Sequence, residues 1–367
     1  MGFAVDPRRL PVDERRGSSL IVPAGFKYRM HSHPFLTVIL PARNAEATIS
    51  SAIASTLNQT YRDFDLWVLE NGSSDRTAEI ARGFSDPRLK IFELGAVGFQ
   101  GALQFAIENA SSEWLARMDA DDLMFPDRLK IQVDMIRQRP DIVLVGTSWA
   151  ILTPFAHIFE RLAGSPSREV NTEILAKGRN FADPSVIFRR RTALEVGGVD
   201  SEFTTGDVPL WFRILERGKG WEIAEPLHLY RIHAQSMCHQ DNFYVQGVSA
   251  RAKYAPHYLK NWPQGRQPSD FWYSIAVLEL QAGDSDAVRQ AARLLDGKGL
   301  RRTARRLRWF SYLGKVGSRA YHYRNRNLSR YRHRPEWERL FAPLLEAEQK
   351  SSTMQTSLDM IHAAVDR

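Results

Sequence analysis

Residues 35–77 read FLTVILPARNAEATISSAIASTLNQTYRDFDLWVLENGSSDRT. The apolar run over 35–40 is typical of a short buried strand, and apolar residues then recur at helical spacing over 49–57. A second apolar run over 65–70 stops at Asn71-Gly72, a pair that favours a turn. This stretch therefore predicts a strand, a helix and a second strand in succession.

The same alternation continues along the next part of the chain. Further strands are expected at 89–93, 114–118 and 142–145, and helices at 99–110 and from 124–126 onward. Alternation over more than 100 residues predicts an α/β fold with a mostly parallel sheet and helices on both of its faces. Ligands bind beyond the carboxyl ends of such strands, so segments 41–46, 70–75 and 119–122 should lie along one rim.

The third of these segments carries the sharpest chemical pattern. Residues 117–122 read Arg-Met-Asp-Ala-Asp-Asp, and three carboxylates this close repel one another unless a cation or hydrogen-bond donors compensate them. Mg²⁺ binds through one or two carboxylates together with substrate phosphates, so the segment suits a site for a nucleoside diphosphate. The alternative is a solvated acidic turn before the next helix, and the motif alone leaves both interpretations open.

Taken together, the segments resemble the family 2 glycosyltransferases, which have the GT-A fold. The resemblance covers residues 35 to about 240 and rests on spaced motifs in the family's order. These are Pro41, Asn44, Gln59-Thr60-Tyr61, Gly72-Ser73-x-Asp75-x-Thr77, Ala116 to Asp122, Asp183-Pro-Ser-Val186, Gly197-Gly-Val-Asp200 and Asp207-x-x-Leu210-Trp211-x-Arg213.

The resemblance implies an inverting enzyme that moves a sugar from a nucleoside-diphosphate sugar onto a glycan or lipid-linked acceptor, as in polysaccharide biosynthesis. It implies Mg²⁺ or Mn²⁺ held by Asp121, with Asp119 and His233 as further metal candidates. It also implies that Asp207 deprotonates the acceptor hydroxyl. The implied donor site contains Pro41, Arg43, Glu46, Asn71, Asp119 and Ala120, with Asp119 facing the ribose or the cation.

Several positions depart from the family pattern. Arg43 stands at the family's tyrosine, Glu70-Asn71 replaces an Asp-Asp pair, and Gly206 replaces the acidic residue before Asp207. Asn71 can still accept a hydrogen bond from a base N–H through its amide oxygen, but without the help of a negative charge. These departures support an alternative function: a non-catalytic protein that binds nucleotide sugars or glycans on a decayed transferase fold.

Charge is distributed unevenly along the chain. The formal net charge is +8, yet residues 297–335 contain thirteen Lys and Arg and no Asp or Glu. The rest of the chain has 37 basic against 42 acidic residues. Within the basic segment, the apolar residues of 300–313 recur at helical spacing between arginines, which is typical of a helix on an anionic membrane surface. Packing of this helix on the catalytic domain and nucleic-acid binding are the alternatives, the last being the least favoured.

These patterns divide the chain into three parts. Residues 1–34 are expected to form an N-terminal extension, 35–248 the GT-A domain, and 249–367 a helical, basic C-terminal region. The single cysteine, Cys238, fits a reducing compartment, and the first residues lack the apolar run of a signal peptide. We therefore expect a cytoplasmic protein, peripheral on the inner face of the membrane.

Overall fold

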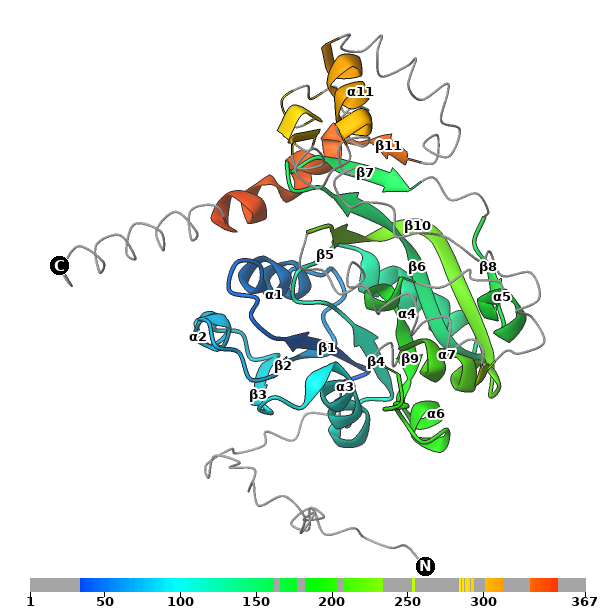
Figure 1. Ribbon diagram of the computed structural model, residues 1–367. Helices are drawn as coiled ribbons and strands as arrows, with labels where there is room; N and C mark the ends of the chain where they lie inside the picture. Colours follow the sequence, from blue (N-terminus) through cyan, green and yellow to red (C-terminus); the bar gives the residue numbers. More distant parts are fainter. Residues whose placement is uncertain are drawn as a thin grey trace, which may run out of the picture. The chain divides into compact units, whose positions relative to one another are not determined.

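The computed structural model describes residues 34–161, 166–176, 182–203, 207–233, 253–254, 284, 286, 288–290, 292–293, 301–312 and 331–348. Figure 1 shows these residues as helices and strands around a central sheet. The α/β class and the flanking helices predicted from the sequence are confirmed.

Four neighbouring strands form the parallel part of the sheet. They are β1 (Leu36–Ala42), β2 (Phe64–Glu70), β3 (Leu89–Glu93) and β4 (Trp114–Arg117), in the order β3-β2-β1-β4. Each lies within a residue or two of its predicted position. Because Leu36 pairs with both Phe64 and Trp114, the three central strands end at the same edge. The loops after them therefore share one rim, as predicted.

The remaining strands extend this sheet and make it mixed. Beyond β4 come β9 (Ile187–Arg189), β6 (Ile142–Leu152), β7 (Ile158–Arg161) and β11 (Tyr331–His333), each antiparallel to its neighbour. The long β10 (Lys219–Arg231) runs parallel to β6 and also pairs with the short strands β5 (Leu123–Met124) and β8 (Arg168–Val170). The periodicity that predicted a mostly parallel sheet carried no information on these antiparallel pairings. Apart from β6 with β7, they join segments far apart in sequence.

Helices cover both faces of the sheet. Leu36, Val38 and Leu40 of β1 pack into a core with α1 (Ile49–Leu57), α2 (Thr77–Arg82) and α4 (Arg128–Gln138). Ile39 points to the opposite face, where α3 (Gly98–Asn109), α6 (Arg190–Glu195) and α7 (Asp207–Leu215) form a second core, with α5 (Thr172–Ala176) at its margin. The alternation of side chains along a strand explains why one apolar run supplies both cores.

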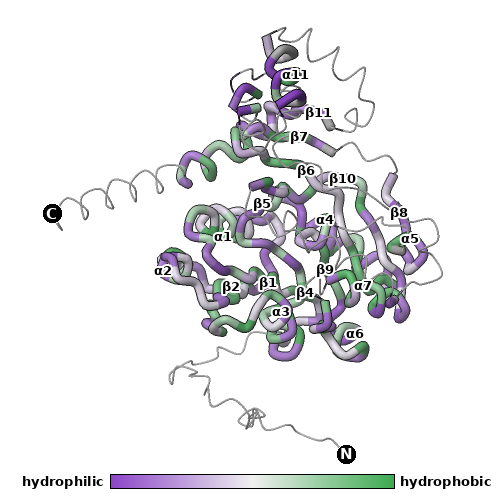
Figure 2. The backbone as a smooth tube through the Cα atoms, viewed as in Figure 1, coloured by the Kyte–Doolittle hydropathy of each residue, from purple (hydrophilic) through white to green (hydrophobic). Residues whose placement is uncertain are grey.

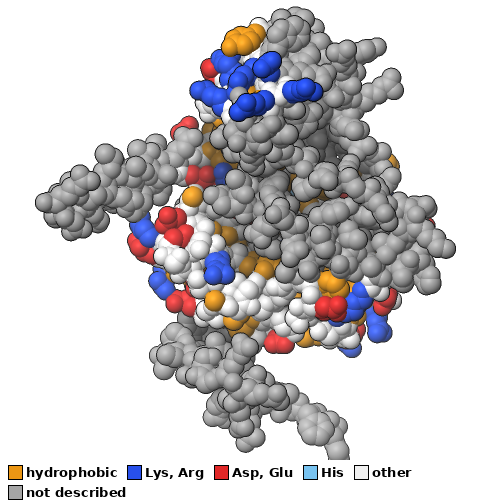
Figure 3. Space-filling model, in the orientation of Figure 1, with side chains coloured by type: hydrophobic (Ala, Val, Ile, Leu, Met, Phe, Trp, Pro, Cys, Tyr) orange, Lys and Arg blue, Asp and Glu red, His pale blue; other side chains and the backbone are white. Residues whose placement is uncertain are grey.

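Much of the predicted basic C-terminal region lies outside the described residues. The described part includes α11 (Arg301–Tyr312), which is predominantly hydrophilic in Figure 2 and carries the group of basic side chains near the top of Figure 3. Ala304 and Leu307, which belong to its predicted apolar face, are fully buried, while Arg301 and Arg302 are exposed. At these two positions the predicted apolar face of α11 is therefore covered by other parts of the protein.

The last described residues pack on the sheet. β11, a strand that the sequence pattern did not predict, pairs with β7 and lies at the edge of the sheet, and a helix over 335–348 follows it. Trp337 and Phe341 of this helix both contact the ring of Phe125 edge-on, each with centroids 5.0 Å apart. Among the described residues, no helix combines the length and the hydrophobicity needed to span a membrane.

Candidate active site

The loops after β1 and β2 are tied together by reciprocal hydrogen bonds. Asn44, at a positive φ of 50°, donates from its backbone N–H to Ser73 Oγ and accepts from the Ser74 N–H at Oδ1, at 3.0 and 2.9 Å. The Ala45 N–H donates to Thr77 Oγ1 at 2.7 Å. These motif residues therefore fix the shape of the rim and lie beside the expected donor site.

Glu46 and Asp75 form the outer part of this connection. The Glu46 N–H donates to Asp75 Oδ2 at 3.1 Å, and the Arg76 N–H donates to Glu46 Oε2 at 3.2 Å. Burial alone would raise the pKa of Asp75, but hydrogen bonds from the side chain and backbone of Thr77 and from the Glu46 N–H hold that pKa below its usual value. Glu46 was predicted to contact the donor, and one of its two carboxylate oxygens thus already accepts a hydrogen bond from the neighbouring loop.

Three predicted donor residues lie at the ends of β1 and β2. Pro41 is the second-last residue of β1 and is partly buried, and Arg43 is exposed beyond the end of the strand. Asn71 is buried, and its Oδ1 accepts the Gly98 N–H at 2.9 Å. This oxygen, expected to accept from a base N–H, thus already accepts one hydrogen bond from the start of α3. It retains a second lone pair, and the Nδ2 amine can donate.

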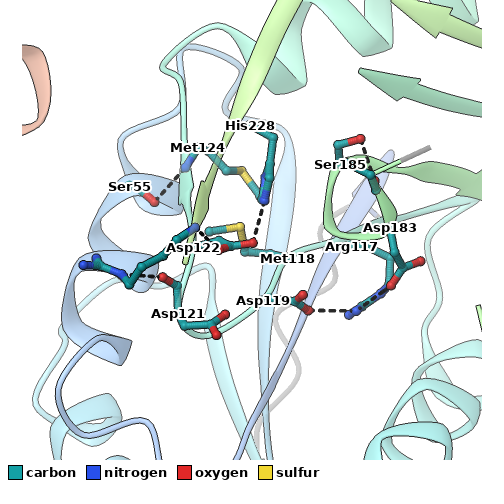
Figure 4. A network of polar contacts seen from close by, with 12 residues as sticks. Ser55, Arg117, Met118, Asp119, Asp121, Asp122, Met124, Asp183, Ser185 and His228 are labelled. Atoms are coloured by element: carbon teal, nitrogen blue, oxygen red, sulfur yellow. Dashed lines mark hydrogen bonds and ion pairs between the residues drawn. The ribbon is translucent and has the colours of Figure 1, made fainter. Parts of the chain in front are cut away.

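The acidic segment after β4 sends its three carboxylates in three directions. Asp119 Oδ1 pairs with Arg117 at 2.8 Å, Asp121 Oδ2 with His233 Nε2 at 2.7 Å, and Asp122 Oδ2 with His228 Nε2 at 2.7 Å. Figure 4 shows Asp119 turned toward Arg117 and Asp122 turned toward His228. One oxygen of each carboxylate nevertheless lies within 4.8 Å of the other two. The three acidic side chains of this turn are therefore each compensated by a different partner.

Asp122 belongs to the interior of the protein. Its Oδ1 accepts the Arg231 N–H at 2.8 Å, and Arg128 approaches the Nδ1 of His228 at 3.2 Å. The side chains of Asp122, His228 and Arg128 are fully buried. Since arginine can only donate, His228 accepts at Nδ1 and donates from Nε2 to Asp122. Each oxygen of Asp122 therefore already has one hydrogen-bond partner, and the residue supports the turn from behind.

The buried charges of this network shift one another's pKa values. Burial, with the neighbouring Asp121 and Asp119 carboxylates, raises the pKa of Asp122 well above its usual range. Burial and the nearby Arg128 and Arg117 charges lower the pKa of His228, so its imidazole is neutral at physiological pH. Burial, with the Arg117 charge, also lowers the pKa of Arg128 to about 9.

The backbone of the acidic turn is held from two sides. Thr48 Oγ1, at the start of α1, donates to the carbonyl oxygen of Ala120 at 2.9 Å, and Arg231 Nε donates to that of Asp121 at 2.7 Å. The Arg231 guanidinium also pairs with Glu348 of the helix over 335–348 at 2.8 Å. The sequence signalled Arg231 only through its closeness to His233, and it contained no signal for Glu348.

Asp119 and Asp121 are the two carboxylates of the turn that reach solvent. Their side chains are 33% and 34% exposed, and that of His233 is 31% exposed. Carboxylate oxygens are the ligands that Mg²⁺ and Ca²⁺ prefer, and imidazole is a common additional ligand for transition metals. The donor set of these three residues therefore fits a divalent cation such as Mg²⁺ or Mn²⁺.

A buried ion pair lies beside Asp119. Arg117 contacts Asp183 Oδ2 through Nε and NH2 at 3.2 and 3.0 Å, and its guanidinium stacks over the ring of Phe99. Within the described part of the chain, Arg117 NH1 and Asp183 Oδ1 are buried without a hydrogen-bond partner. Asp183 belongs to a quoted motif, but the sequence gave no reason to place it next to Arg117. One donor of Arg117 and one acceptor of Asp183 thus remain unused in this part of the structure.

Asp207, the predicted base, begins α7 close to this pair. Burial raises the pKa of Asp183 to about 7, with further contributions from the charges of Asp207 and Asp119, and it also raises the pKa of Asp119. Because the charge of Asp207 acts on both groups, its carboxylate lies near them. The fold thus brings the predicted metal, donor and base residues to one rim.

Comparison with known proteins gives a consistent result. The model of the family described as Glycosyl transferase family 2 matches residues 37–196. The chain is 32% identical over 211 residues to the O-antigen biosynthesis glycosyltransferase WbnJ of Escherichia coli, covering 55% of this chain and 81% of that one. It is 38% identical over 102 residues to the UDP-Glc:alpha-D-GlcNAc-diphosphoundecaprenol beta-1,3-glucosyltransferase WfgD of Escherichia coli, covering 28% of this chain and 40% of that one.

A solved structure agrees on the fold. The crystal structure of residues 1–349 of S. aureus TarS in complex with UDP-GlcNAc superposes with a TM-score of 0.50 at 14% identity. The match covers 78% of this chain and 91% of that one.

Proposed function

This chain belongs to glycosyl transferase family 2 and is a glycosyltransferase, and from that premise we propose a metal-dependent, inverting transfer from a nucleoside-diphosphate sugar. The observation that carries the proposal is the position of Asp119 and Asp121. They are the solvent-reaching carboxylates of the acidic turn. This turn follows β4, which pairs with β1, and the charge of Asp207 acts on Asp119.

The donor nucleotide would bind along the rim formed by β1, β2 and β4. Pro41, Arg43, Glu46 and Asn71 would surround its base and ribose, with Asn71 Nδ2 donating to a carbonyl oxygen of the base. Asp119 and the backbone of Ala120 would lie beside the ribose. Because the Thr48 and Arg231 side chains hold the turn by its carbonyl groups, its carboxylates need little reorganisation when the donor arrives.

Asp121, Asp119 and His233 would hold a divalent cation. When bound, such a cation neutralises the charge that develops on the departing diphosphate. Asp121 and His233 are already 2.7 Å apart. On metal binding, both would replace this contact with bonds to the ion.

Asp207 would act as the general base. It begins α7, and its charge acts on Asp119 and Asp183, which supports a carboxylate near the acidic turn. There it could accept the proton of an acceptor hydroxyl as that hydroxyl attacks the anomeric carbon from the face opposite the diphosphate. Direct displacement of this kind inverts the anomeric configuration.

The acceptor is proposed from the relatives. WbnJ is named for O-antigen biosynthesis, and the name of WfgD specifies a saccharide on diphosphoundecaprenol as its acceptor. We therefore propose a glycan or lipid-linked saccharide acceptor in polysaccharide biosynthesis, used by a cytoplasmic enzyme at the inner face of the membrane. Since Ala304 and Leu307 are buried, α11 would approach anionic lipid through its exposed arginines.

Calorimetric titration with nucleoside diphosphates tests the proposal. We expect Mn²⁺-dependent binding of at least one of them by the wild-type chain and its loss in Asp121→Asn. Asp134→Asn is the matched control, because Asp134 lies on the outer surface of α4 in an exposed pair with Lys130. Nucleotide affinity that is the same without Mn²⁺ and in the Asp121→Asn variant would contradict the metal site.

Donor hydrolysis separates an enzyme from a pure binder. A transferase slowly passes sugar to water, and we expect Asp207→Asn to suppress this reaction while nucleotide binding persists. Binding without hydrolysis or transfer, using a panel of nucleotide sugars and lipid-linked acceptors, would instead favour the non-catalytic alternative.

A further inference from the structure

A second group of metal-ligating side chains lies at the edge of the sheet, apart from the residues described above. It consists of His157, His333 and Glu338, which we call the edge cluster. One ligand atom of each lies within 4.8 Å of the other two. His157 precedes β7, while His333 ends β11 and Glu338 lies in the helix that follows. Antiparallel pairing of β11 with β7, in which His333 is opposite Phe159, brings these distant segments together.

The spacing of the two imidazole rings is compatible with one tetrahedral ion. Their centroids are 5.4 Å apart and their planes meet at 87°. With Zn–N bonds of about 2.0–2.1 Å and tetrahedral angles, two histidines on the same zinc have ring centroids roughly 5 Å apart. The observed spacing therefore needs no large movement to accommodate zinc.

Glu338 is oriented as a third ligand. Its Oε1 accepts the Ile158 N–H at 3.1 Å and contacts His333 Nε2 at 2.6 Å. Both contacts use the same oxygen, so Oε2 has no hydrogen-bond partner within the described part of the chain. A backbone N–H that fixes the orientation of a ligating carboxylate is a usual feature around metal ions.

The charges around the edge cluster favour a cation. Asp284 Oδ2 lies 3.9 Å from His157 Nε2, so a second carboxylate is near enough to complete the coordination or to bind a coordinated water. Arg334, next to His333 in sequence, is paired with Glu160 and Glu336, at 3.2 and 3.0 Å. The cluster side chains are 21–25% exposed, which leaves an ion a route of entry.

We propose that the edge cluster is a structural zinc site. Zinc would take the place of the proton that His333 Nε2 and Glu338 Oε1 share, releasing that proton to solvent. Two imidazoles and a carboxylate suit zinc, whereas the carboxylates of Asp119 and Asp121 suit a harder cation. The two sites therefore differ in the cation that their ligands favour.

The ion would fasten the last described segment to the sheet. Glu338 shares a helix with Trp337 and Phe341, which contact Phe125, and with Glu348, which pairs with Arg231. Arg231 in turn holds the acidic turn. A zinc ion at the edge cluster would thus stabilise the helix that supports the candidate active site from outside.

Metal analysis of the full chain tests this proposal. The protein is stripped with a chelator, dialysed against ZnCl₂ and then against metal-free buffer, and its zinc content is measured by mass spectrometry. We expect one zinc per chain in the wild type and in Asp121→Asn, and a raised unfolding temperature with zinc. His333→Gln should lose the zinc, and Glu336→Gln, an exposed neighbour on the same helix, should retain it.

Cobalt gives a second readout that is independent of the variants. Co²⁺ at a site with two histidines and a carboxylate should show the intense visible absorption of four-coordinate geometry, and zinc should displace it. A wild-type chain that retains no zinc overturns the proposal, as does a His333→Gln chain that retains it in full. If His333→Gln does not fold, the wild-type zinc content and the cobalt spectrum still decide.

Discussion

Replacing Asp122 with asparagine tests whether a buried chain of donors and acceptors holds the acidic turn. In the wild type, Arg128 donates to His228, His228 donates to Asp122 Oδ2, and the Arg231 N–H donates to Asp122 Oδ1. Asparagine has the same shape, but one of its two polar ends is a donor. With its oxygen toward the Arg231 N–H, its amine faces His228. The histidine must then carry its proton on Nδ1, where that proton opposes Arg128.

The expected cost follows from the contacts that are lost. Asp122→Asn removes a buried hydrogen bond and leaves two buried donors facing each other, and a buried donor without an acceptor costs about 1–3 kcal/mol. No water can compensate readily, since all three side chains are fully buried. We expect the free energy of unfolding to fall by about 3 kcal/mol, a large part of the ~5–15 kcal/mol typical of a folded domain.

Urea unfolding followed by circular dichroism measures this change. Asp134→Asn is the control, because its pair with Lys130 is exposed and should contribute less than about 0.5 kcal/mol. A double-mutant cycle with His228→Leu should give a cost below the sum of the single costs, since both changes break the same chain. An Asp122→Asn protein as stable as the control would refute the reasoning.

Three further predictions concern other parts of the site. Burial raises the pKa of Asp183 to about 7 from the usual 3.8, so the folded state binds this proton more tightly and loses stability as pH rises through that window. As the pH rises from 3.8 to about 7, Asp183→Asn should therefore gain stability relative to wild type. Urea unfolding at several pH values measures this, and a free-energy difference between the two proteins that stays constant with pH would contradict it. Gly72→Ala should cost at least about 1–2 kcal/mol in thermal unfolding, because Gly72 has a φ of 71° and a Cβ would lie 2.9 Å from the backbone nitrogen of Ala96. An unchanged unfolding temperature would show that the loop can shift. Glu348→Gln should lower stability by about 1 kcal/mol and weaken Mn²⁺-dependent nucleotide binding, because the charge that holds Arg231 is lost. If calorimetry shows that this variant binds the nucleotide with wild-type affinity, Glu348 does not support the site.

The loop motifs illustrate how a sequence pattern can be informative for a reason other than the expected one. Asn44, Ser73 and Thr77 helped to identify the family, yet in the structure they hydrogen-bond to neighbouring backbone and connect two loops. Their spacing is set by the geometry of the rim. Asn71, expected to present its amide oxygen to the base, already accepts the Gly98 N–H at that oxygen.

The sequence by itself determined the features that depend on local order. The strands at 36–42, 64–70, 89–93 and 114–117 follow from apolar runs, and the shared rim follows from the rule that parallel strands end at one edge. That rule sufficed to group Pro41, Asn71 and Asp121. Charge counting located the basic segment, but hydrophobic spacing could not tell whether its apolar face meets lipid or protein.

Only the tertiary structure decided which partner each charged group receives. Asp119, Asp121 and Asp122 are almost adjacent in sequence, yet one pairs with Arg117, one with His233 and one with His228. Those partners lie on β4 and on or just beyond the end of β10, a strand that joins the sheet through pairings that no local pattern encodes. The same holds for Asp183 beside Arg117 and for His157 beside His333 and Glu338. Periodicity reports which face a residue occupies, whereas long-range strand pairing sets its neighbours, and the chemistry depends on the neighbours.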